Sequence, residues 1–229
     1  MINRMGKQFA AVAIVLTTLL LGVGATAFAQ GRDDPFADSQ IWTETQVSIK
    51  LRPDLRLILI GTIRLGRNDS AFINEQAGIG LSRNFGEHLT GAVYYRYISS
   101  EPTPDRQSRE NRLQFELTPR TPLKWGFGMS DRNRIEWRNI NGRVSWRYRN
   151  RLQFDHPVAI GERRITPYVA GEIQCDTRYD TCNRNQVYAG ARVPLSKHVT
   201  FDGFYMRQWD ARTRPGFIQV IGAYWRLEF

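Results

Sequence analysis

The chain has 229 residues, of which 41% are hydrophobic, and a formal net charge of +10. This charge does not indicate nucleic-acid binding, because the arginines alternate along the chain instead of gathering in one basic segment. After the first 29 residues, no stretch approaches the roughly 18 consecutive apolar residues of a helical span. Any crossing of a membrane would therefore depend on strands.

The first 29 residues have the pattern of a secretory signal peptide. Arg4 and Lys7 precede an apolar run over residues 9–25, and the small residues Ala27 and Ala29 then form a cleavage site. A transmembrane anchor is the alternative, but the run has 17 residues, at the short limit for a span. Cleavage after Ala29 would lower the charge from +10 to +8 and leave residues 30–229 as a single domain.

Apolar and polar residues then alternate with the period of a β-strand. In residues 40–51, Ile41, Val47 and Ile49 share one face, and Trp42 lies on the other. Residues 54–66 repeat the pattern, and no helical periodicity follows. Further strands are predicted over residues 71–83, 88–98, 109–118, 123–138, 143–155, 164–175, 184–194, 198–209 and 217–229. The chain is therefore predicted to be all-β.

The connections between these segments alternate in length and polarity. SSEPTPDRQS, DTRYDTCNR and DARTRPG are longer and more polar than NFGEH, TPRTP and PLSK. Long outer loops and short periplasmic turns are typical of an antiparallel up-and-down barrel in the bacterial outer membrane. Eleven strands are counted, whereas such barrels have an even number. We therefore expect ten to twelve strands and favour twelve, with a further short strand near residues 34–40 or one segment wrongly divided or merged.

The last strand ends in alternating apolar residues. Trp225, Leu227 and Phe229 share one face with Ile221 and Ala223, which suits a lipid-facing strand and predicts a signal for the barrel assembly machinery. The edge strand of a soluble sandwich would give the same local pattern. Aromatic residues elsewhere are predicted to form an outer girdle, while Trp42 faces inward; the girdle tryptophans are Trp125, Trp137, Trp146, Trp209 and Trp225.

Arginines are concentrated on one face of two neighbouring strands. This predicted wall consists of Arg132, Arg134, Glu136, Arg138, Arg147, Arg149 and Arg151. Each arginine would cost about 2 to 4 kcal/mol on the lipid face, so the wall must face the lumen, where Glu116 and Glu172 can pair with it. It would either fill the barrel as an ion-pair network or bias an open path toward a small anionic solute.

Cys175 and Cys182 are the only cysteines. In an exported chain they are predicted to form a structural disulfide. A metal site would need further ligands at suitable spacing, and a redox pair would normally read C-x-x-C.

Several segments resemble the domain-of-unknown-function (DUF) 2490 family of Gram-negative bacteria. They are IWTE, NRIEW followed by WRYRNRLQF, PYVAGEI, and NRNQVYAGARVPLSKHVTFDGFYM, with the signatures Arg-x-Arg-x-Glu at 132–136 and Arg-Tyr-Arg-x-Arg at 147–151. The resemblance covers nearly all of residues 30–229. It implies an outer-membrane β-barrel and supplies no activity or catalytic residues.

No catalytic constellation is apparent, so we expect a protein that is not an enzyme and has no cofactor or metal. His88, His156 and His198 fall in or beside short turns, and no Gly-x-Ser-x-Gly motif occurs. Contacts are expected with outer-membrane lipid and with lipopolysaccharide, whose phosphates Arg207, Arg212 and Arg214 could meet. The resulting hypothesis is a monomeric outer-membrane barrel, either a narrow, porin-like anion-biased channel or a structural envelope protein. A lipid- or peptide-hydrolysing enzyme is the alternative.

Overall fold

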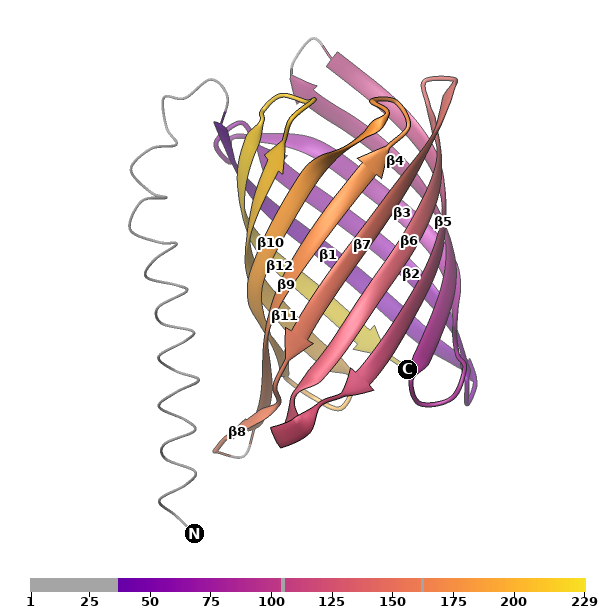
Figure 1. Cartoon of the computed structure of the whole chain (residues 1–229), viewed down its shortest axis with the longest axis vertical. Coiled ribbons are helices and arrows are strands. Elements are labelled where there is room, and N and C mark those ends of the chain that lie inside the picture. The colour runs from indigo at the N-terminus through magenta and orange to yellow at the C-terminus, as the bar shows by residue number, and fades with distance from the viewer. Residues whose placement is uncertain (1–36, 104–105, 162) are drawn as a thin grey trace.

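The computed structural model describes residues 37–103, 106–161 and 163–229, and it forms a closed β-barrel (Figure 1). The predicted signal peptide and its cleavage site lie outside these residues. The barrel strands are β1 (Ala37–Arg52), β2 (Leu55–Gly66), β3 (Ala71–Asn84), β4 (Leu89–Thr103), β5 (Arg106–Pro122), β6 (Gly128–Ile140), β7 (Arg143–Asp155), β9 (Arg163–Asp176), β10 (Thr181–Pro194), β11 (Val199–Asp210) and β12 (Phe217–Glu228). The prediction of an all-β barrel is confirmed.

The wall contains eleven strands, so the preference for twelve is wrong. A twelfth strand, β8 (Val158–Ile160), has only three residues and pairs with β9 alone. Residues 37–40 continue β1 and add no strand of their own. Because consecutive strands alternate in direction, an odd number brings the first and last strands together in parallel. β1 and β12 pair in this way from Ala37↔Phe217 to Ser48↔Glu228, so the sheet is mixed.

The connections divide between two ends of the barrel. Phe229, β8 and the short helix η1 (Lys124–Gly126) lie at one end, which we call the C-terminal end, and β1 starts at the other (Figure 1). NFGEH and PLSK connect strands at the C-terminal end, TPRTP finishes β5 there, and the three longer polar segments lie at the opposite end.

The predicted difference in loop length holds for only one of the three long segments, DARTRPG, where residues 211–216 join β11 to β12. Four residues join β9 to β10 at the opposite end, and four join β3 to β4 and β10 to β11 at the C-terminal end. SSEPTPDRQS and DTRYDTCNR mostly extend strands instead, as the pairings Ser100↔Ser108 and Thr103↔Arg106 show for the first and Thr181↔Asp176 for the second.

The outer surface of the wall carries an exposed apolar band. Its members include Leu59, Ile79, Val93, Phe115, Ile135, Leu152, Val187 and Ile221. Trp146, Trp209 and Trp225 are exposed on the same surface, and Trp42 is buried inside. Trp125 differs from the prediction: it lies in η1 with a φ of 60°, because the predicted strand over 123–138 begins only at Gly128.

The interior is packed with side chains rather than empty. One part of it is apolar, and its buried cluster consists of Trp42, Tyr168, Ala170, Tyr188, Phe204, Met206, Ile218 and Val220. Met206 has no exposed surface, and Val220 is 1% exposed. We call this group the apolar cluster. A second part of the interior is lined by β5, β6, β7 and β9 and carries a cluster of arginines. Elsewhere inside, Arg96 of β4 forms an ion pair with Glu44 of β1.

Candidate functional site

A tight hairpin sets the register of the arginine-bearing strands β6 and β7. Asn141 and Gly142 join them with φ angles of 49° and 85°, the left-handed conformations that a two-residue hairpin turn requires. The register places Arg132 opposite Arg151, Arg134 opposite Arg149, and Glu136 opposite Arg147. Because like charges that face each other destabilise a strand pair, these arginines need carboxylates from neighbouring strands.

Glu136 is the centre of the arrangement and has no exposed surface. Arg147 donates from Nε to Glu136 Oε2 over 2.6 Å, and Gln114 donates from Nε2 to Oε1 over 3.0 Å. Three further arginines surround it, with nitrogen–oxygen distances of 3.4 Å for Arg149, 3.8 Å for Arg112 and 3.9 Å for Arg134. One buried carboxylate thus faces four guanidinium groups.

Glu172 of β9 brings a second group of arginines together. It accepts hydrogen bonds from Arg132 Nη2 at 2.7 Å, Arg149 Nε at 2.7 Å and Arg151 Nε at 3.0 Å. The guanidinium of Arg151 also lies 3.8 Å from the ring centre of Tyr188, a member of the apolar cluster. This contact joins the arginines to the apolar cluster.

Three more carboxylates complete the network. The predicted partner Glu116 accepts a hydrogen bond from Arg134 Nε at 2.8 Å. Two others were not predicted: Glu110 and Asp176 accept hydrogen bonds from Arg138, each at 2.7 Å. Glu110 shares a face of its strand with Arg112, Gln114 and Glu116, so its position was visible in the alternation. Asp176 belonged to a segment interpreted as a loop.

Positive charge exceeds negative charge in this arginine network. Its carboxylates are Glu110, Glu116, Glu136, Glu172 and Asp176, and its arginines are Arg112, Arg132, Arg134, Arg138, Arg147, Arg149, Arg151 and Arg178. Arg178 lies in the β9–β10 connection. Burial lowers its pKa, but hydrogen bonds to Asp176 outweigh this effect and place the pKa above its ordinary value.

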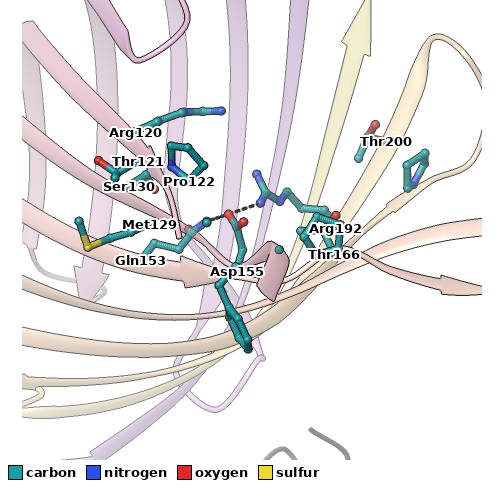
Figure 2. Close-up of a pocket in the computed structure, with 15 residues that line it drawn as sticks. Arg120, Thr121, Pro122, Met129, Ser130, Gln153, Asp155, Thr166, Arg192 and Thr200 are labelled. Atoms are coloured by element: carbon teal, nitrogen blue, oxygen red, sulfur yellow. Dashed lines mark hydrogen bonds and ion pairs between the residues drawn. The ribbon is translucent and has the colours of Figure 1, made fainter. Parts of the chain in front are cut away.

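A cavity opens into the lumen at the C-terminal end, below the packed interior (Figure 2). It has a volume of about 450 Å³ and is lined by residues of β5, β6, β7, β9, β10 and β11. Arg120 and Arg192 extend into it, and Arg192 Nη2 donates to Asp155 Oδ2 over 2.7 Å. We call it the mouth cavity.

The predicted disulfide is confirmed. Cys175 of β9 and Cys182 of β10 face each other across the strand pair at the opposite end and are bonded. They are separated by seven positions in the sequence.

Replacing both cysteines by serine is expected to lower the free energy of unfolding by about 2 to 3 kcal/mol, because the bond closes a short loop in the unfolded chain. Guanidinium unfolding of the protein in phospholipid vesicles, followed by tryptophan fluorescence, measures this change. Wild-type protein treated with a reductant should shift equally. An unchanged unfolding midpoint in both samples would contradict the prediction.

The histidines are separated from one another around the C-terminal end. His88 and His198 are exposed in strand connections, and His198 Nδ1 lies 2.6 Å from the Glu228 carbonyl oxygen. His156 stacks on Phe127 with ring centres 4.4 Å apart. Within residues 37–103, 106–161 and 163–229, no cluster of His, Cys, Asp or Glu is placed to hold a metal ion, and no helix is long and apolar enough to cross a membrane.

Comparison with known proteins identifies the family and the fold. The β domain of the Bordetella autotransporter BrkA is 13% identical with a TM-score of 0.50, and the match covers 79% of this chain and 86% of that one. LpxR from Salmonella typhimurium is 11% identical with a TM-score of 0.50, over 80% and 86% of the two chains. At this identity the likeness concerns the fold alone. No curated protein matches the sequence. The family model described as "Protein of unknown function (DUF2490)" matches residues 39–217, so the chain belongs to the DUF2490 family.

Proposed function

We propose that the protein is a structural barrel of the Gram-negative outer membrane with a sealed lumen. The apolar band on its outer surface and its likeness to outer-membrane barrels support this location. Residues 1–29 would direct its export. In this proposal the protein is monomeric and its outer surface meets membrane lipid and lipopolysaccharide.

The observation that carries the proposal is the continuous packing of the interior. Glu136 in the arginine network and Met206 in the apolar cluster both have no exposed surface. Arg151 of the arginine network stacks on Tyr188 of the apolar cluster. Arg64, an arginine outside the network, stacks on Trp42 of the same cluster, with its guanidinium carbon 3.7 Å from the ring centre. A path wide enough for hydrated ions would leave some of these side chains exposed. The interior therefore resembles a protein core rather than a channel.

The test is ionic current through the refolded protein in a planar bilayer. We expect no discrete conductance steps, provided that heat-modifiable gel mobility shows the protein to be folded. Removing the bulk of the apolar cluster in the double variant Trp42→Ala/Met206→Ala should produce steps, whereas Trp225→Ala on the outer surface should not. Anion-selective steps in the wild type would overturn the proposal and favour a channel. The excess of positive charge in the arginine network is the observation that favours this second function.

The proposal gives the protein no catalytic role. None of the described histidines forms a side-chain hydrogen bond with a serine, threonine or carboxylate that would make a nucleophile and base pair. The alternative function is a lipid- or peptide-hydrolysing enzyme. It would be supported if the purified protein cleaved outer-membrane lipid or peptide and if changing one residue at either end of the barrel abolished this cleavage.

A further inference from the structure

We infer that the mouth cavity binds a phosphate-sized oxyanion from the aqueous phase at the C-terminal end of the barrel. This binding function goes beyond the sealed structural barrel and does not depend on whether the lumen conducts. The inference rests on the charge, the hydrogen-bond donors and the shape of the cavity.

Two arginines reach the cavity from well-separated strands. Arg120 comes from β5 and Arg192 from β10, and Figure 2 shows both guanidinium groups pointing into the same space. No carboxylate of the described chain lies within ion-pair distance of Arg120. Arg192 is paired with Asp155, but its Nε is buried and has no hydrogen-bond partner among the described residues. The cavity therefore has one carboxylate for two guanidinium groups, and some guanidinium N–H groups remain available to donate hydrogen bonds to a ligand.

Hydroxyl groups supply further donors around the arginines. The lining hydroxyl residues are Thr121, Ser130, Thr166 and Thr200. The volume of about 450 Å³ falls within the range of small-molecule sites, roughly 300 to 1,000 Å³. A guanidinium fork matches the geometry of phosphate and carboxylate oxygens, and hydroxyl groups can complete the contacts. The chemistry therefore favours a compact oxyanion over a cation or a neutral solute.

The backbone of β6 leaves room for this arrangement. A Cβ at Gly128 would lie 2.7 Å from Asp155 Oδ1, so a larger residue there would make the carboxylate shift. Asp155 also accepts a hydrogen bond from Gln153 Nε2 at 3.2 Å. Asp155 pairs with Arg192 and leaves Arg120 to the ligand. Asp155 also competes with a bound anion for Arg192.

The test uses inorganic phosphate titrated into the refolded full-length mature protein in a maltoside detergent, which contains no phosphate. Binding is measured by calorimetry and by broadening of the phosphate ³¹P resonance. We expect Arg120→Gln and Arg192→Gln each to weaken binding by about tenfold or more, the loss of one charge-assisted contact. Asp155→Asn should tighten binding, because it removes the competing carboxylate. Arg83→Gln is the matched control: it removes an arginine at the same end, but one that pairs with Asp54 outside the cavity.

Several results would overturn the inference. They are an absence of phosphate binding by the wild type, equal binding by wild type and Arg120→Gln, or weaker binding by Asp155→Asn. Short-chain phosphatidylglycerol is titrated in parallel, and binding of this lipid without binding of inorganic phosphate would also count against a soluble anion. Gel mobility confirms that each variant is folded, and Arg120→Gln remains informative if Arg192→Gln does not fold, since Arg120 takes part in no ion pair among the described residues.

Discussion

Replacing Glu136 by glutamine is expected to lower the free energy of unfolding by about 3 to 5 kcal/mol. The substitution keeps the size of the side chain but removes a charge that faces Arg112, Arg134, Arg147 and Arg149 inside the barrel. Arg112, Arg134 and Arg149 keep the second carboxylates Glu110, Glu116 and Glu172, whereas Arg147 would stay buried without the one carboxylate it pairs with among the described residues. Guanidinium unfolding in phospholipid vesicles, followed by tryptophan fluorescence, measures the change.

A matched control separates burial from the loss of charge. Glu87 is exposed in the β3–β4 connection, and Glu87→Gln should change stability by less than about 0.5 kcal/mol. Adding Arg147→Met to Glu136→Gln should restore part of the loss, because it removes the charge that the first substitution leaves unpaired. If Glu136→Gln unfolds at the wild-type denaturant concentration, the network contributes nothing to stability and the prediction is wrong.

Replacing Gly222 by alanine is expected to destabilise the protein by about 1 to 3 kcal/mol through overpacking. A Cβ at this inward-facing position of β12 would lie 2.1 Å from Phe204 Cζ and 2.2 Å from Phe204 Cε1. The Phe204 ring cannot move away freely, because the rings of Tyr188 and Tyr224 pack against it with centres 5.7 and 4.9 Å away. Unfolding in vesicles again gives the magnitude.

The outer surface offers the same substitution without the clash. Gly61 has no atom within 4 Å of an added Cβ, so Gly61→Ala should leave stability unchanged or slightly raised. Phe204→Leu should relieve the clash, and its combination with Gly222→Ala should therefore cost less than the sum of the two single changes. Equal effects at Gly61 and Gly222 would show that contact with Phe204 is not the cause.

Strand alternation was sufficient to predict the barrel and the inward direction of the arginines. The two-residue period decides which face each side chain occupies, and burying Arg134 or Arg147 against lipid would cost too much. The same alternation gave the boundaries of β7 and β12 nearly to the residue. Cys175 and Cys182 could be paired because they are the only cysteines.

Features that depend on closure could not be read from the sequence. Whether β12 meets β1 in parallel depends on the exact strand count. Alternation indicates eleven strands, as the structure has them, but the even number that is usual in such barrels favours twelve. Ion-pair partners across the lumen depend on register and barrel shape, so Asp176 was missed. The apolar cluster has a signal in the alternation, since Ile218, Val220 and Met206 occupy the inward face of their strands.

The odd number of crossings gives the barrel a polarity that even-stranded barrels lack. An even number returns both ends of a chain to the same aqueous compartment. Here the polypeptide enters the wall at Ala37 at one end of the barrel and leaves it at Glu228 at the other. In the outer-membrane barrel that we propose, assembly would have to carry the start of β1 across the bilayer, and the closing seam would form only after that translocation.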